Sequence, residues 1–230
     1  MRRTAMRAVV TMPVLVLLLA GLLQPAGAQT TETGAVKFRW AFGALVGPEG
    51  DRRLVAVDKD RVLHSGDQIK FFLQPRSGCY IYIFYHSAQD ELVRLFPVDT
   101  AGTALVPDSQ HTVPEGDRWF RLDEQAGPET FYLLASATRL ERLEALSAQL
   151  TIPAAVEGRR AAAEAVLAEI KHLRRTHRQL KVDAERPVRL GGNFRGTAKT
   201  DGTALPDIRD IAVELSTGTF YSRTFRIDHR

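Results

Sequence analysis

The chain has one cysteine among its 230 residues, and this scarcity excludes an internal disulfide. Stability must therefore come from buried apolar surface and not from cross-links. Cys79 itself begins the apolar run Cys-Tyr-Ile-Tyr-Ile-Phe at residues 79–84. Because free cysteine is among the most buried residue types, we expect a buried and unreactive thiol.

Signatures of catalysis and of cofactor binding are also missing. The sequence has no Gly-x-Ser-x-Gly elbow, no His-Glu-x-x-His helix, no P-loop, no dinucleotide fingerprint and no zinc-type cysteine spacing. His172 and His177 are five residues apart, which separates them around a helix and argues against a metal-ligand pair. We therefore expect no metal and no cofactor. Distant residues can still assemble a Ser-His-Asp triad, so an enzyme stays an open alternative.

Neither sign of charge dominates the sequence. It holds 31 Lys and Arg against 27 Asp and Glu, and three of the arginines, with no acid, fall within residues 1–28. The rest of the chain therefore carries 28 basic and 27 acidic residues. A nearly neutral domain has no long-range field to attract nucleic acid, so we expect no nucleic-acid partner.

Residues 1–28 have the three parts of a secretory signal peptide. Three arginines make a basic start, residues 8–23 are almost wholly apolar, and Ala-Gly-Ala at residues 26–28 supplies the small side chains that signal peptidase requires. The apolar stretch contains Pro13 and is shorter than the roughly 20 residues of a membrane-spanning helix. We expect Sec-type export with cleavage between Ala28 and Gln29, and hence a periplasmic or secreted protein.

Alternation of apolar and polar residues predicts strands along most of the remaining chain. In the first of them, Val36, Phe38, Trp40 and Phe42 share one face. Residues 79–85 are apolar on both faces, which places this strand in the middle of a sheet. Short polar turns join the runs and indicate antiparallel hairpins. The expected strands are 36–42, 53–58, 68–73, 79–85, 92–96, 131–137, 188–190, 211–215 and 219–227, and residues 97–128 are turn-rich with one short apolar stretch at 119–122.

The apolar period changes to three or four residues between Arg139 and Lys181. Leucines recur at this spacing over residues 140–150, and a second stripe contains Val166, Ile170 and Leu173. This spacing predicts two amphipathic helices. The predicted fold is mainly β: a single domain over residues 29–230, an antiparallel, Ig-like β-sandwich with a helical insertion at 139–181 before the last strands.

A basic cluster lies at the end of the second predicted helix. Cations there complement the helix dipole, so a solvated face is one interpretation. The other is weak binding to an anionic membrane or to lipopolysaccharide. The candidate binding residues are Lys171, Arg174, Arg175, Arg178 and Lys181.

Aromatic residues offer two further expectations. Trp40 lies on the apolar face of its strand and is expected in the core, whereas Trp119 stays open as part of a sugar-binding platform. Tyr80 and Tyr82 share one strand face, and such tyrosines commonly keep a wet hydroxyl at a sheet margin.

Four short segments follow one another at a specific spacing: Leu-His-Ser-Gly-Asp at 63–67, Gly-Cys-Tyr-Ile-Tyr-Ile-Phe at 78–84, Leu-Phe-Pro at 95–97 and Gly-Pro-Glu-Thr-Phe-Tyr-Leu-Leu-Ala-Ser at 127–136. Together with Phe-Arg-Ile-Asp-His at 225–229, they resemble the DUF4384 family, a bacterial domain of unknown function. The resemblance implies an all-β module of exported or envelope proteins, and it supplies no catalytic residues.

These observations favour an exported, non-catalytic binding or envelope-associated module, whose partner is an unknown protein or envelope component. One alternative is a carbohydrate-binding domain, which would present a planar row of exposed aromatic rings. Another is a hydrolase on a β scaffold, which would unite a histidine, an acid and a nucleophile in a cleft.

We predict that the exported protein begins at Gln29, because Ala-Gly-Ala follows an apolar segment with a basic start. Mass spectrometry of the protein recovered outside the cytoplasm measures this directly. Recovery of a chain that still carries residues 1–28 would contradict it.

Overall fold

The structure, a computed structural model, describes residues 34–58, 60–98, 103–152, 155–178 and 206–230. The chain divides into two units, Met1–Thr31 and Glu32–Arg230, and all described residues belong to the second. The predicted signal peptide with its cleavage point at Ala28 and Gln29, the predicted strand at 188–190, and Lys181 lie outside the described residues.

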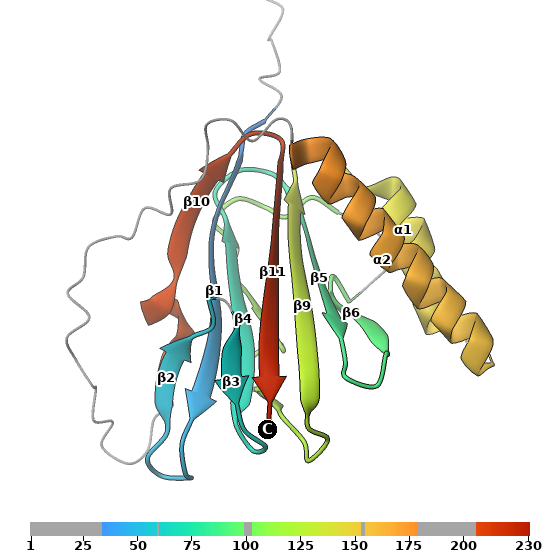
Figure 1. Ribbon diagram of the computed structural model, residues 1–230. Helices are drawn as coiled ribbons and strands as arrows, with labels where there is room; N and C mark the ends of the chain where they lie inside the picture. Colours follow the sequence, from blue (N-terminus) through green and yellow to red (C-terminus); the bar gives the residue numbers. More distant parts are fainter. Residues whose placement is uncertain (1–33, 59, 99–102, 153–154, 179–205) are drawn as a thin grey trace, which may run out of the picture. The chain divides into compact units, whose positions relative to one another are not determined.

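Two sheets form the domain, and most of their strands pair in antiparallel fashion (Figure 1). The first, sheet A, has the order β10-β1-β4-β7, with β2 paired to β1 and β8 paired to β4. Its strands are β1 (Val36–Val46), β2 (Arg53–Ala56), β4 (Gln68–Pro75), β7 (His111–Val113), β8 (Phe120–Arg121) and β10 (Val213–Thr217).

The second sheet, sheet B, has the order β3-β11-β9-β5-β6. Its strands are β3 (Arg61–Leu63), β5 (Tyr80–His86), β6 (Leu92–Phe96), β9 (Gly127–Ser136) and β11 (Phe220–His229). The last strand, β11, lies inside the sheet, antiparallel to β9 and parallel to β3. The mainly β sandwich is therefore confirmed, and its Ig-like character stays a prediction.

The core between the sheets follows from strand alternation. Phe42 and Phe71 of sheet A stack with ring centroids 3.9 Å apart, and both rings contact Phe131 and Phe225 of sheet B. Such aromatic groups bury large apolar areas and hold the two sheets together. Trp40 is buried, as expected, and Cys79 is fully buried, as its position in an apolar strand predicts.

A second apolar layer lies between sheet B and two helices. α1 (Glu141–Ala148), the 3-10 turn η1 (Gln149–Thr151) and α2 (Val156–Arg178) pack there, and Leu143, Val166 and Ile170 meet the side chains of Tyr82, Phe84, Leu134 and Phe220. Figure 1 shows both helices beside β5 and β6. Among the described helices, none is long and apolar enough to cross a membrane.

Tyr82 corrects one sequence expectation. Its hydroxyl is not wet: the side chain is 1 % exposed, donates to the Glu144 carboxylate at 2.6 Å, and accepts from the Leu140 backbone N–H at 3.2 Å. Arg139 pairs with the same carboxylate at 2.7 Å. The hydroxyl is therefore satisfied by the helical segment that covers the sheet, and it fixes the start of α1 against β5.

Short elements were the ones that the pattern missed. β3 and β7 span three residues each, which is too short for alternation to be distinguished from a loop.

Residues 211–215 were expected as a strand, but the 3-10 turn η2 (Ile208–Ile211) comes first and β10 begins at Val213. β9 begins at Gly127, four residues before the expected strand start at Phe131.

We predict that Ile170→Asp lowers the free energy of unfolding by roughly 2–5 kcal/mol, because it removes a buried aliphatic group and places a charge among apolar side chains. Ile170 is 2 % exposed. The matched control is Lys171→Asp, at the next and exposed position of α2, which should change stability by about 0.5 kcal/mol or less. Equal denaturant midpoints for the two variants would mean that α2 does not pack on sheet B.

Candidate functional site

A groove of about 1490 Å³ opens on the outer face of sheet A. β4 supplies its floor through Lys70 and Phe72, and the loop that follows β7 supplies one wall through Trp119. η2 and its N-cap residue add residues 207–209, and residues 95–98 and 103–106 also line the groove. Ligand sites are typically concave, mostly apolar and furnished with a few placed polar groups, and this groove has those properties.

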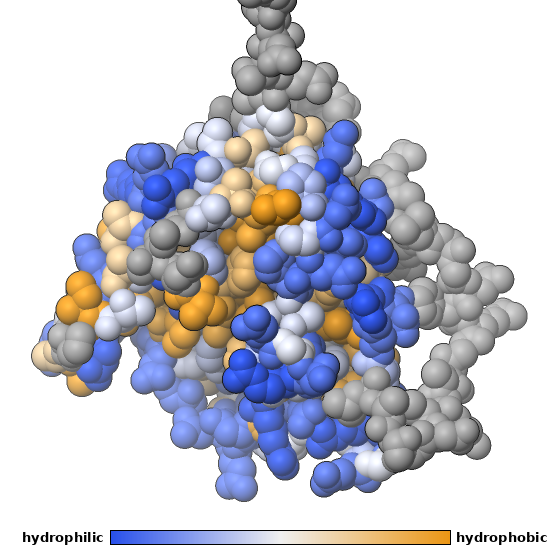
Figure 2. All heavy atoms as spheres, turned by 180° about the vertical axis from the view of Figure 1, so that it is seen from behind, coloured by the Kyte–Doolittle hydropathy of each residue, from blue (hydrophilic) through white to orange (hydrophobic). Residues whose placement is uncertain are grey.

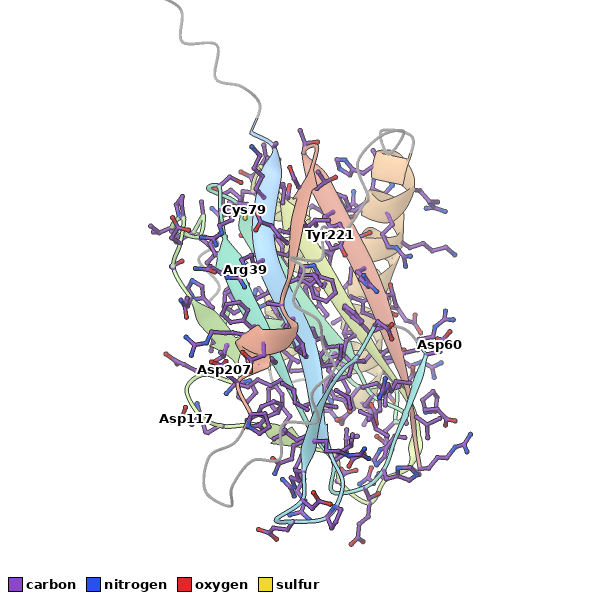
Figure 3. All side chains as sticks on the ribbon, turned by 90° about the vertical axis from the view of Figure 1, so that its left-hand side faces the viewer. Arg39, Asp60, Cys79, Asp117, Asp207 and Tyr221 are labelled. Atoms are coloured by element: carbon purple, nitrogen blue, oxygen red, sulfur yellow. The ribbon has the colours of Figure 1, made fainter. Side chains whose placement is uncertain are left out.

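The figures place the groove on one side of the molecule. In Figure 3, Asp117 and Asp207 come from separate segments and project from the same side as Arg39. That side faces the viewer in Figure 2, where apolar residues gather along the middle of the surface and hydrophilic residues flank them. On this side of the molecule, an apolar area is therefore flanked by hydrophilic residues.

Lys70 is a charged residue in the floor of this groove. Its position in β4 points it to the outer face, where it is only 5 % exposed. Its ammonium lies 5.4 Å from the ring centroid of Trp119 and donates to the carbonyl oxygen of Gly116. Burial lowers the pKa of Lys70, and the charges of Asp117 and Asp207 oppose that shift. The amine is thus held by a carbonyl and by the π face of Trp119, and the charges of two carboxylates favour its protonated form.

The η2 wall is positioned by packing against β1. An added Cβ on Gly43 would lie 2.9 Å from Ile211 and 3.3 Å from Ile208, so glycine is what allows η2 to approach the strand so closely. The Asp207 carboxylate caps the turn by accepting from the Arg209 backbone N–H at 2.9 Å.

Arg209 links Asp207 to Gln110, the residue that precedes β7. Its Nε donates to Asp207 at 2.6 Å, and its guanidinium also donates to the Gln110 side chain at 3.4 Å. The hydrogen bond from Arg209 lowers the pKa of the Asp207 carboxyl. A fixed carboxylate, guanidinium and amide thus stand at one end of the groove, where they can bind hydroxyl or amide groups of a ligand.

The predicted basic cluster lies on α2 and does not belong to this groove. Lys171, Arg174 and Arg175 are exposed on the helix, and α2 ends at Arg178. Burial raises the pKa of Tyr132, and the charges of Arg174 and Arg226 oppose that shift, so both cations lie near this ring of sheet B. The exposed cluster therefore continues from the helix onto β11 through Arg226.

Sequence reasoning missed most of the groove. Lys70 is a lone cation inside the apolar run of β4, and this interruption is the signal that could have marked it. Asp207 and Arg209 carry no comparable signal, because their place depends on the packing of η2 over Gly43. Trp119, which the sequence left open, lines the groove and is half-buried. Within the described ranges, no group of three or more His, Cys, Asp or Glu side chains could hold a metal ion.

Comparison with protein families matches residues 62–139 to a domain of unknown function, DUF4384. This range contains four of the five segments that carry the resemblance and leaves out residues 225–229. It also contains Lys70, Trp119 and much of the groove wall. No curated protein and no solved structure matches the chain.

Proposed function

We propose that this chain, whose residues 62–139 match the DUF4384 family, is an exported binding module that takes its ligand in the groove of sheet A. The support for export is the basic, apolar and small-residue order of residues 1–28. The support for binding is the groove itself, whose floor and η2 wall hold charged groups in fixed positions beside apolar side chains.

The chemistry of the groove favours a carbohydrate of the cell envelope as the ligand. Trp119 is half-buried, so part of its indole is accessible to the C–H face of a sugar ring. The Asp207–Arg209 pair and Gln110 offer acceptors and donors for hydroxyl and amide groups within the same groove. A partly exposed aromatic ring beside a fixed polar set is a combination that suits sugars better than a purely apolar ligand.

Intrinsic fluorescence tests this proposal, because the chain has two tryptophans. Trp40 is 5 % exposed in the core, and a Trp40→Phe variant leaves Trp119 as the reporter in the groove. We expect solubilised peptidoglycan fragments to change its emission with saturation. Arg209→Ala should weaken binding by about tenfold or more, as expected for the loss of a charged hydrogen bond.

The control for this titration is Arg160→Ala, which removes an exposed arginine of α2 and should leave binding unchanged. Equal affinity for the Arg209→Ala and Arg160→Ala proteins would place the ligand outside the groove. Absence of any saturable change would exclude these glycans as its ligand.

A second candidate function is contact with an anionic envelope surface. Its support is the exposed cluster of Lys171, Arg174 and Arg175, with Arg226 on the neighbouring strand. Membrane surfaces with anionic lipids attract such clusters, and each cation near the surface contributes about 1 kcal/mol.

We predict that Arg174→Glu combined with Arg175→Glu weakens sedimentation with vesicles that contain phosphatidylglycerol, most clearly at low salt, where screening is weakest. Lys37→Glu combined with Arg53→Glu makes the same charge change at exposed positions of sheet A and serves as control. Equal sedimentation of both double variants would assign the cluster to a solvated face.

A further inference from the structure

A second cluster of reactive side chains lies at the C-terminal end of β11, which Figure 1 marks beside β3. The Ser65 hydroxyl lies 3.2 Å from Nε2 of His229, and Nδ1 of His229 lies 3.8 Å from a carboxylate oxygen of Glu129. His229 is 2 % exposed and Glu129 is 3 % exposed, whereas Ser65 is exposed. A surface hydroxyl, a buried imidazole and a buried carboxylate thus stand in sequence, outside the lining of the groove.

Backbone pairing fixes the three residues relative to one another. His229 pairs with Leu63 of β3 and with Gly127 of β9. Ser65 follows Leu63 by two positions in the chain, and Glu129 follows Gly127 by two positions. Ser65 belongs to a turn in which the Asp67 N–H donates to the His64 carbonyl and Gly66 has a φ of +92°. The Ser65 N–H donates to the Arg230 carbonyl, which ties this turn to the end of β11.

The contact between Ser65 and His229 fits either tautomer of the imidazole, and activation of the serine requires one of them. When the Ser65 hydroxyl donates to Nε2, the proton of the neutral imidazole must be on Nδ1, facing the Glu129 carboxylate. Tyr85 is beside the same carboxylate: burial, followed by Glu129, raises the pKa of its phenol, which therefore stays neutral. Nδ1 has no hydrogen-bond partner among the described residues, and the Glu129 carboxylate at 3.8 Å favours the tautomer with the proton on Nδ1, which leaves Nε2 free to accept a proton.

We propose that Ser65 is an activated nucleophile for acyl transfer from carboxylic esters, with His229 as its general base and Glu129 as the residue that orients and stabilises the imidazole. The order nucleophile, base and orienting carboxylate is the arrangement that activates serine on unrelated folds. Loose spacing between imidazole and carboxylate is common before a substrate binds, and it shortens when the imidazole becomes charged. The exposed Ser65 suits an ester that projects from a larger molecule.

The proposed reaction balances in two steps. Ser65 Oγ bonds to the ester carbonyl carbon while its proton moves to His229 Nε2; the bond from that carbon to the alkoxy oxygen then breaks, and the alcohol leaves with the proton. In the second step water bonds to the acyl carbon and gives a proton to His229 Nε2. The bond from that carbon to Ser65 Oγ then breaks, the carboxylic acid leaves, and Oγ regains its proton from Nε2.

Charge that develops on the carbonyl oxygen requires a donor other than the turn itself. The N–H groups of Ser65 and Gly66 donate to the carbonyls of Arg230 and Leu122. Arg121 offers a cation beside this turn, since its guanidinium lies 3.6 Å from the point where a side chain on Gly66 would begin. We assign Arg121 to the stabilisation of this oxyanion.

The chain contains an internal control for Ser65. Ser109 also contacts a histidine, with its hydroxyl 2.9 Å from Nε2 of His111, but that hydroxyl donates to the Val106 carbonyl at 2.6 Å. Its proton is therefore committed to a backbone carbonyl, and the serine is not activated. Comparison of Ser65 with Ser109 therefore distinguishes an activated hydroxyl from one that only lies close to a histidine.

A biotinylated fluorophosphonate, which bonds covalently to activated serines, tests the proposal on the chain from Gln29 to Arg230. We expect one label per protein, mapped by mass spectrometry to the peptide with Ser65. Ser65→Ala should abolish labelling and the hydrolysis of p-nitrophenyl butyrate, and Ser109→Ala should change neither. His229→Gln should slow labelling by about 100-fold or more, as expected for loss of a general base.

Thermal melts show whether each variant is folded. This control is needed for His229→Gln, because His229 is buried and its replacement can unfold the protein. Ser65→Ala changes an exposed residue and removes one hydrogen bond to His229, so it should melt a few degrees lower at most and remain folded under the assay conditions. If the folded wild type takes no label at Ser65, or if labelling and hydrolysis survive in Ser65→Ala, the proposal is overturned. These readouts do not depend on the groove, so they are independent of the binding function proposed above.

Discussion

The pairing of β11 with its two neighbours is the constraint on which the rest of the structure depends. This strand comes last in the described chain, yet it lies between β3 and β9 and pairs with β9 over its full ten-residue length. One of its faces carries Tyr221, Phe225 and Ile227 into the core between the sheets, and the other carries Phe220 to the helices. Its end brings His229 to Ser65 and Glu129.

The two sheets differ in how their outer faces are covered. Sheet B is covered by α1 and α2, whose apolar stripes fill the space over Tyr82 and Phe84. On sheet A, short segments cover Ala41 and Phe72, namely η2 and the loop that carries Trp119. The ammonium of Lys70 lies over the ring of Trp119. Among the residues that the structure describes, this cover is incomplete and leaves a groove, which is why the candidate binding surface lies on sheet A.

Much of the fold was predictable from local pattern. Alternation identified the long strands and their inward faces, including the burial of Trp40 and Cys79, because each face of a strand reads directly from the sequence. The period of the leucines identified both helices, which occupy residues 141–148 and 156–178 within the predicted insertion at 139–181. The three-residue strands β3 and β7 lacked enough alternation to be recognised.

The sites could not be predicted in the same way, because each depends on contacts between distant segments. Ser65 and His229 are separated by 164 positions, and neither has a neighbouring motif that marks chemistry. Segments 63–67, 127–136 and 225–229 carried the family resemblance, and the structure brings one member of the cluster from each of them together. Their meeting depends on strand order and register, which the single sequence does not state.

The most direct test of this account is the proton position on His229, measured by long-range ¹H–¹⁵N correlation NMR on the neutral ring with Ser65→Ala as reference. The account predicts the tautomer with hydrogen on Nδ1, with an Nε2 shift that moves when the Ser65 hydroxyl is removed. A ring with its hydrogen on Nε2 would contradict the role of His229 as general base, and shifts insensitive to Ser65→Ala would contradict the placement of His229 beside Ser65 at the end of β11.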